Sequence, residues 1–372
     1  MRDNRQHLVQ GGPGTGKTWL AFEQAYRLAE RESGKSVLLL CYNLALARTL
    51  EAMVAKRKPK CGAIAVRSWE MLAREIFQSA RIKWKEPLDY EERRQFFNEV
   101  VPARMREIVN AGKFKPRFDG LVVDEAQDHD TRFADQPADD DGAGWWSVYW
   151  KLLHEGTNAP MAAFYDPGQR PLFRNPAAFD VGTLRRHLSQ ATHVRLANAL
   201  RYSRPVFQFL KSLQSEATAP LVNELRHKGI LPDGADVELH ETAPEKAISK
   251  INEVVTNWII GGFCRADDIL VLSPHRQKSR SCLAGWDQIG AWPLVEYEHR
   301  QPGQIAHLSI NKAKGLDSLA VILVDLKPFA QLPDEQSQMD FCMGASRARQ
   351  LLAVVQSNNG HCRIGRTGKH CA

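Results

Sequence analysis

The glycine-rich segment GGPGTGKT, residues 11–18, constrains the fold of this chain more than any other feature. It fits the pattern G-x-x-x-x-G-K-[ST], in which glycines let the backbone curl and point its N–H groups at phosphate oxygens. A short apolar strand, residues 7–10, precedes it, and an amphipathic helix, residues 18–32, follows it. This strand–loop–helix unit predicts an α/β fold with a phosphate-binding loop. A glycine turn that binds nothing is the alternative.

The loop residues have distinct expected tasks. Backbone N–H groups and the positive end of the following helix bind phosphate oxygens. Lys17 reaches the β- and γ-phosphates of a nucleotide, and the Thr18 hydroxyl holds Mg²⁺. The residues expected to bind the nucleotide are Gly11, Gly12, Pro13, Gly14, Thr15, Gly16, Lys17 and Thr18.

A phosphate loop needs a carboxylate that helps to hold Mg²⁺ and a group that positions the attacking water. The segment LVVDEAQD, residues 121–128, contains two acidic residues for these tasks. Asp124 ends an apolar strand, from which it can reach Mg²⁺ through the water shell of the metal. Glu125 follows, where it can orient or deprotonate the attacking water. In the alternative interpretation, both acids only cap the next helix.

Composition excludes several classes of protein. The chain is 43% hydrophobic and 25% charged, without an apolar run of membrane-spanning length and without the apolar core of a signal peptide. Its seven cysteines form no C-x-x-C pair, which favours the reducing cytoplasm over a disulfide framework. A formal charge of +7 favours a polyanionic partner. Residues 124–142 are acidic, and any single charge run is also explained as a solvated face.

Short apolar runs alternate with amphipathic stretches, a pattern typical of parallel sheets covered by helices. The pattern starts again after residue 190, so we expect two α/β lobes, residues 1–189 and 190–356. A helical insertion is expected within the first lobe at residues 67–117, and a disordered tail at 357–372. The clearest strands are residues 36–42, 120–125, 161–166, 268–273 and 319–325, and the clearest helices are 44–56, 91–109 and 145–155.

With GGPGTGKT and DEAQD in place, the chain resembles a superfamily 1 helicase of the UvrD/Rep type. In its compactness it is most similar to the helicase part of proteins with a nuclease-related N-terminal domain. The resemblance covers residues 8 to about 356. Further segments follow in the family's order: LLLCYNLALARTL, IAVRSWEMLAREIF, FYDPGQRPLF, LANALRYSRPVFQF, LSINKAKGLDSLAVILV and MGASRARQLLAVV.

The resemblance implies that ATP, with Mg²⁺, binds between two RecA-like lobes. Asp166 and Gln169 match residues near the γ-phosphate, and Asp317 replaces a glutamate of the ATP site. Arg201 and Arg347 match arginines that reach the γ-phosphate from the second lobe, where they would speed hydrolysis and sense the phosphate. A surface ion pair is the alternative for either arginine.

The resemblance also implies that nucleic acid crosses both lobes, where aromatic rings stack on bases and cations contact the backbone. Trp69 and Phe173 equally suit a hydrophobic core. The candidate contacts are Tyr42, Asn43, Ser68, Trp69, Phe173, Asn311 and Lys312.

Besides Asp317, the chain departs from the family pattern in three ways. Asn311 replaces a histidine, and the large insertion in the second lobe is absent. The upstream glutamine segment that contacts adenine in the family needs more residues than precede Gly11. A natural truncation, a misassigned start, a fragment and a missing partner subunit each explain this. We therefore expect tight triphosphate binding with poor discrimination between bases.

The sequence thus predicts an ATP-dependent DNA helicase or translocase on single strands, with 3′→5′ polarity and a role in DNA repair implied by resemblance alone. One alternative is an RNA-directed or remodelling ATPase that does not unwind. Another is a nucleic-acid-binding switch gated by nucleotide. Single-stranded DNA, or RNA, is the expected partner, and no membrane is expected.

Overall fold

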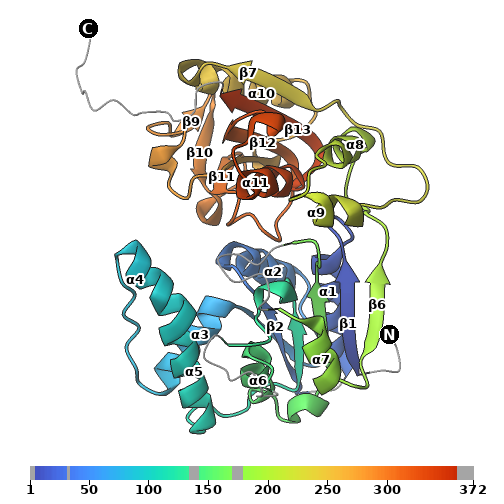
Figure 1. The fold of residues 1–372 in the computed structure, drawn as a ribbon, viewed down its shortest axis with the longest axis vertical. Helices are drawn as coiled ribbons and strands as arrows, with labels where there is room; N and C mark the ends of the chain where they lie inside the picture. Colours follow the sequence, from blue (N-terminus) through green and yellow to red (C-terminus); the bar gives the residue numbers. More distant parts are fainter. Residues whose placement is uncertain (1–4, 32–33, 134–141, 170–178, 358–372) are drawn as a thin grey trace. The chain divides into compact units, whose positions relative to one another are not determined.

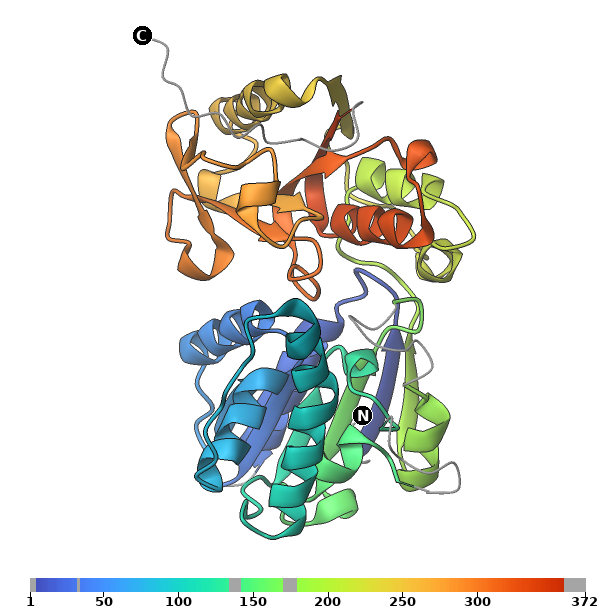
Figure 2. The same ribbon diagram turned by 60° about the vertical axis from the view of Figure 1, so that its left-hand side comes forward.

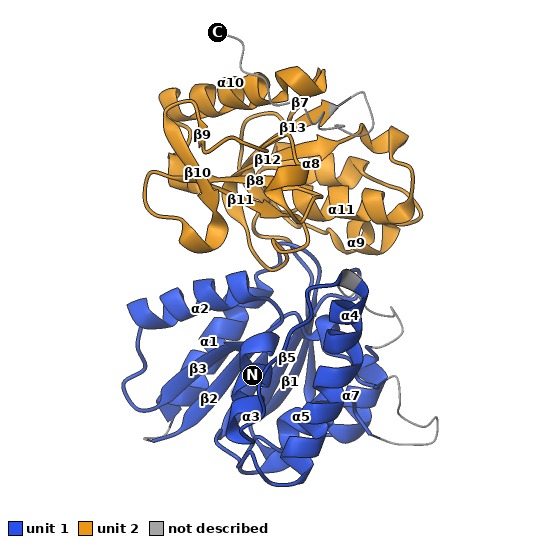
Figure 3. Cartoon of the chain, turned by 90° about the vertical axis from the view of Figure 1, so that its left-hand side faces the viewer, with its two compact units in different colours: residues 1–198 blue, residues 199–372 orange. Residues whose placement is uncertain are grey.

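The computed structural model describes residues 5–31, 34–133, 142–169 and 179–357. The chain divides into two compact units, residues 1–198 and 199–372 (Figure 3). This boundary lies beyond the one expected near residue 190, because β6 (Thr192–Leu196) pairs in parallel with β1 (Gln6–Gly11) of the first unit. The expected tail from residue 358 onward, and residues 134–141 of the acidic loop, lie outside the described residues.

The first unit is built on a parallel sheet with the strand order β3-β2-β4-β5-β1-β6 (Figure 1). Its central strands are near-continuous apolar runs, as expected for strands covered on both faces. In β2, for example, Leu38 and Leu39 point to opposite faces and both are fully buried. The remaining strands are β2 (Ser36–Cys41), β3 (Ala63–Ser68), β4 (Gly120–Val123) and β5 (Met161–Tyr165).

Helices cover both faces of this sheet. The helix α1 packs against β2, β4 and β5. On the other face, Leu38 and Leu40 share a core with side chains of α3, α5 and α6. The helices α3 and α5 lie side by side there (Figures 1 and 2). The helices of the unit are α1 (Lys17–Arg31), α2 (Leu44–Lys56), α3 (Trp69–Ser79), α4 (Tyr90–Gln95), α5 (Val101–Asn110), α6 (Trp145–Trp150) and α7 (Val181–His187).

The expected helical insertion lies between β3 and β4 and consists of α3, α4 and α5. Residues 91–109 were expected to form one helix, but α4 and α5 are joined by a π-helical turn, Phe96–Val100. Pro102 explains the difference, because it cannot donate the α-helical bond to Asn98. The N–H of Val101 instead bonds to the carbonyl of Phe96, five residues back.

The second unit repeats this architecture with the strand order β7-β13-β12-β8-β11-β10-β9. Its strands pair in parallel except for β9, which pairs antiparallel to β10. The predicted α/β class is therefore confirmed in both units. The elements are α8 (Arg204–Ser212), α9 (Ala219–Glu224), β7 (Glu238–Thr242), α10 (Ala247–Ile260), β8 (Ile269–Ser273), β9 (Gln288–Ile289), β10 (Trp292–Glu296), β11 (Ile305–Ser309), β12 (Ser318–Leu326), α11 (Glu335–Ala345) and β13 (Ala348–Ser357).

Candidate functional site

The glycine-rich loop connects β1 to α1. Gly14 and Gly16 have φ angles of 73° and 87°, which residues with a side chain rarely adopt. The hydroxyl of Thr15 donates to the carbonyl oxygen of Gly12 at 2.9 Å and closes the turn. The two glycines are therefore required by the shape of the loop, which leads into the N-terminus of a fifteen-residue helix.

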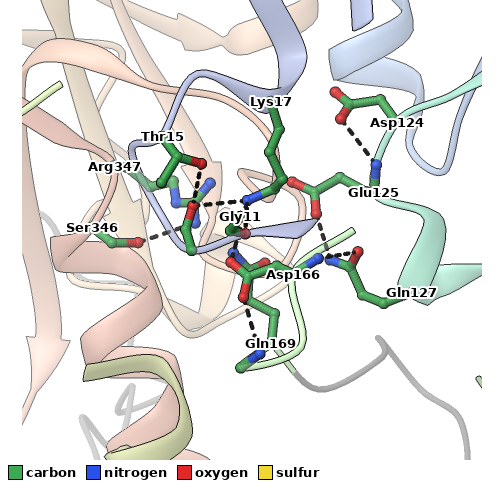
Figure 4. A network of polar contacts seen from close by, with 12 residues as sticks. Gly11, Thr15, Lys17, Asp124, Glu125, Gln127, Asp166, Gln169, Ser346 and Arg347 are labelled. Carbon is green, nitrogen blue, oxygen red and sulfur yellow. Dashed lines mark hydrogen bonds and ion pairs between the residues drawn. The ribbon is translucent and has the colours of Figure 1, made fainter. Parts of the chain in front are cut away.

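Lys17, the first residue of α1, is almost fully buried. Its ammonium donates to the carbonyl oxygens of Gly11 and Gly12 at 2.8 and 2.9 Å and lies 3.3 Å from Asp166 Oδ2 (Figure 4). A cation held inside a glycine-rich loop at a helix N-terminus is suited to bind phosphate.

Asp124 follows β4 and is completely buried. Its pKa is raised to about 7, first by burial and second by the charge of Glu125, although Thr18 and the charge of Lys17 act in the opposite direction. Its Oδ1 accepts from the N–H of Glu125 at 3.0 Å, but Oδ2 has no hydrogen-bond partner among the described residues. A buried, unpartnered carboxylate oxygen is costly and would be stabilised by a cation.

A magnesium ion fits this arrangement. The hydroxyl of Thr18 lies close enough to the carboxylate of Asp124 to lower its pKa, so both oxygen donors are already near each other. Oxygen donors of this kind, completed by phosphate and water, are those that Mg²⁺ prefers.

Glu125 has a left-handed backbone, with φ of 52° and ψ of 46°. For a residue other than glycine, this conformation costs about 1–3 kcal/mol and is typical of functional sites. The amide of Gln127 donates to Glu125 Oε2 at 2.5 Å, and its Oε1 accepts from the N–H of Asp166 at 3.1 Å. Gln127 thus connects the segment after β4 to the segment after β5.

The segment after β5 completes the network (Figure 4). Asp166 is fully buried, which raises its pKa, whereas the charge of Lys17 lowers it. Its Oδ2 accepts from the amide of Gln169 at 2.9 Å. Lys17, Asp166, Gln127 and Glu125 therefore form one continuous chain of contacts. Sequence reasoning missed Gln127, although its position within DEAQD was a usable signal.

The second unit brings together three residues that were assigned to the nucleotide site. Arg201 forms an ion pair with Asp317 at 2.9 Å. Arg347 is buried, and its guanidinium donates to the carbonyl of Leu316, the residue before Asp317, at 3.2 Å. Segments separated by more than a hundred residues thus meet in this unit. Arg347 also donates to the Met343 carbonyl and the Ser346 hydroxyl, each at 3.0 Å.

Two candidate nucleic-acid contacts in the first unit have structural tasks. Asn43 accepts from the N–H of Leu46 at 2.7 Å and caps the N-terminus of α2. Ser68 is fully buried and caps α3 by accepting from the N–H of Met71 at 3.2 Å. The Ser68 side chain is therefore not placed to contact a nucleic-acid strand, in contrast to the expectation that it would.

The expectation that Trp69 stacks on a base also needs correction. Its side chain is only 4% exposed, and its ring packs edge-on against Trp145 with 5.2 Å between centroids. The core interpretation therefore describes this residue. Tyr42 is partly buried beside the ring of His129, whereas Phe173 lies outside the described residues.

In the second unit, Lys312 lines a cavity of about 220 Å³ at the carboxyl ends of β8, β10 and β11. Asn311 is its neighbour in the loop after β11. Sequence reasoning did not single out the segment HRQK, residues 275–278, which follows β8 after Pro274 and lines this cavity. The lining residues are Ser273, His275, Arg276, Gln277, Lys278, Ser281, Leu283, Glu296, Glu298, His307, Leu308, Ser309 and Lys312.

A family model described as Schlafen group 3, DNA/RNA helicase domain, matches residues 4–218. This is more than half of the chain. No curated protein matches the sequence. None of the helices in the described part of the chain is long and apolar enough to cross a lipid bilayer.

Solved structures share the fold at low sequence identity. Dbp5 of S. cerevisiae, bound to RNA and ADP BeF3, is 11% identical with a TM-score of 0.50, and the match covers 97% of this chain and 81% of that chain. The DEAD-box helicase Mss116, bound to ssRNA and UDP-BeF, is 11% identical with a TM-score of 0.46, over 96% and 68% of the two chains. Arterivirus nonstructural protein 10, a helicase in complex with DNA, is 13% identical with a TM-score of 0.42, over 94% of this chain. The present chain spans 60% of the length of that arterivirus helicase. The likeness to Dbp5 identifies both units as RecA-like lobes.

Proposed function

Because the chain belongs to the family of Schlafen group 3 DNA/RNA helicase domains, we propose that it is an ATP-dependent helicase or translocase acting on single-stranded DNA. The observation that carries the proposal is the contact network of Lys17, Asp166, Gln127 and Glu125, with Asp124 and Thr18 beside it. Polarity from 3′ to 5′ follows only from the resemblance to UvrD/Rep helicases, as does the assignment to superfamily 1.

Each residue of the network has a task in hydrolysis. The loop N–H groups and Lys17 bind the β- and γ-phosphates. Thr18 and Asp124 would hold Mg²⁺, which when bound neutralises charge on the phosphate oxygens. Glu125 orients the attacking water and accepts its proton, while the hydrogen bond from Gln127 fixes the carboxylate in place.

The proposal gives the arginines of the second unit a role in the same reaction. Arg347 and Arg201 would stabilise the charge that develops on the transferred phosphoryl group. Contacts with Leu316, Met343 and Ser346 fix the orientation of the Arg347 guanidinium, which reduces the entropy lost when it binds phosphate. Asp317 holds Arg201 in a similar way.

The test is ATP hydrolysis by the whole chain with and without single-stranded DNA or RNA. We expect single-stranded DNA to raise turnover and Glu125→Gln to abolish it while nucleotide binding is retained, because the amide cannot accept a proton. Lys17→Ala should weaken binding and turnover together. Glu107→Gln, on the exposed face of α5, is the control and should behave as wild type.

The outcomes distinguish the alternative functions. Stimulation by RNA alone would replace the DNA proposal with an RNA-directed ATPase, which the family's DNA/RNA description also accommodates. If nucleic acid stimulates ATP hydrolysis but the protein separates no strands, translocation or remodelling would be its function. Hydrolysis that is insensitive to both nucleic acids would support a nucleotide-gated switch. Near-normal turnover by Glu125→Gln would refute the assignment of the catalytic site.

A further inference from the structure

The cavity of the second unit lies where ligands usually bind in open α/β sheets, at the carboxyl ends of parallel strands. Its volume of about 220 Å³ is below the range of roughly 300–1,000 Å³ that is usual for sites of drug-sized ligands. A space of this size suits one planar base better than a whole nucleotide.

One wall of the cavity is held in place by Asp325, at the end of β12. Its backbone is left-handed, with φ of 61°, and its carboxylate accepts from Ser273 Oγ at 2.7 Å and from the N–H of Cys282 at 2.9 Å. The hydroxyl of Ser281 donates to the same carboxylate. Both ends of the segment that carries Arg276 and Lys278 are therefore anchored, and the wall is preorganised.

The cavity is lined by charges of both signs. Burial is the largest cause that lowers the pKa of His307. The charges of Lys278 and Lys312 lower it further, whereas those of Glu296 and Glu298 raise it. All four charges therefore act on the same histidine in β11. One carboxylate oxygen of Glu298 is shielded from water and has no hydrogen-bond partner among the described residues. If the Glu298 side chain turns so that this oxygen faces the cavity, a ligand N–H group supplies the missing bond.

We propose that this cavity takes an unstacked guanine of the bound single strand. The Watson–Crick edge of guanine presents a carbonyl oxygen next to two N–H donors, on N1 and N2. A carboxylate accepts two parallel N–H bonds, and an ammonium donates to the carbonyl. With its carboxylate turned into the cavity, Glu298 would accept from N1 and N2. Lys312, or Lys278 after it leaves its exposed partner Asp287, would donate to O6. Thymine lacks the second donor, and adenine and cytosine present an acceptor where guanine has N1–H.

This inference rests on the proposed binding of single-stranded nucleic acid, so its test includes a sequence-neutral strand. Fluorescence anisotropy would compare three oligonucleotides about twelve nucleotides long, within the range of known single-strand site sizes. One is all thymine, one has guanine at every third position, and one has hypoxanthine, which lacks the 2-amino group, at the same positions. Each is measured with the whole chain and with Glu298→Gln. Glu253→Gln, on the exposed side of α10, is the matched control.

We expect the wild type to bind the guanine strand roughly tenfold more tightly than the thymine strand, and the hypoxanthine strand to lose most of this gain. Glu298→Gln should lose the preference but bind the thymine strand as before, and Glu253→Gln should keep the preference. Equal affinity of the wild type for the guanine and hypoxanthine strands would overturn the inference, whatever the variant does.

A preference that survives in Glu298→Gln would also overturn it. After either of these two results, a thymine strand that still binds and stimulates hydrolysis would leave the proposed function standing without the guanine site. Failure of the wild type to bind any strand would refute the proposed function and the inference together.

Discussion

Replacing Asp124 with asparagine should stabilise the metal-free protein while removing its activity. The side chain of Asp124 is fully buried, and this burial raises its pKa from the ordinary value of 3.8 to about 7. Between these values the folded protein keeps the proton that the unfolded chain has released. The free energy of unfolding therefore falls as pH rises through this window. Asparagine cannot ionise, so the variant avoids this loss.

The size of the effect follows from the pKa. Each pH unit within the window costs about 1.4 kcal/mol. The wild type stops losing stability near pH 7, the pKa of folded Asp124. Between about pH 5 and about pH 8, the free energy of unfolding of Asp124→Asn should therefore gain about 3 kcal/mol relative to that of the wild type. The control Glu107→Gln removes a carboxylate that is 62% exposed and should show no comparable growth.

Urea unfolding with a metal chelator, followed by tryptophan fluorescence, measures this difference. The buried Trp145 and Trp146 belong to the same unit as Asp124 and report on it directly. Mg²⁺ with a nucleotide should reverse the order of stability, because only the wild type can offer the metal a carboxylate. An advantage of equal size at both pH values would refute the reasoning that burial of this carboxylate is costly.

Two further predictions concern turnover. Gln127→Ala should lower kcat roughly tenfold or more with little change in ATP affinity, because Glu125 loses the hydrogen bond that orients it; parallel changes in kcat and ATP affinity would contradict a positioning role. Arg347→Ala should lower kcat by about two orders of magnitude with a modest change in ATP affinity, and normal hydrolysis by that purified variant would remove the arginine from the active site.

The strands that could be predicted from the sequence are those that contain a local run of apolar residues. The predicted strands 36–42 and 120–125 contain the apolar runs 37–41 and 121–123, and they correspond to β2 and β4, two inner strands of the first sheet. The strand β6 lies at the edge of this sheet and its residues are mostly polar and partly exposed. Its assignment to the first unit depends on pairing with β1, almost two hundred residues away, which no local pattern reveals.

The same distinction applies to the candidate site. Motif spacing identified Lys17, Asp124 and Glu125, because the chemistry of phosphate and metal binding restricts the residue types. The position of Gln127 within DEAQD was a signal for the residue itself, but its contact with Asp166 was not predictable, because that contact requires the segments after β4 and β5 to lie side by side. The burial of Trp69 likewise depends on Trp145, far along the chain.

The pairing of β1 with β6 has a mechanical consequence. In the register of this pair, Gly11, the first residue of the phosphate loop, is opposite Leu196, and the chain enters the second unit at Ala199. A covalent tether to the second unit therefore starts beside the nucleotide loop. Tension applied along the polypeptide would reach Gly11 as shear on the backbone hydrogen bonds between two strands, with no side chain needed to transmit it. We therefore expect the phosphate loop to respond to tension through backbone bonds. Substitution of an exposed side chain such as that of Leu200, just inside the second unit, should leave this response unchanged.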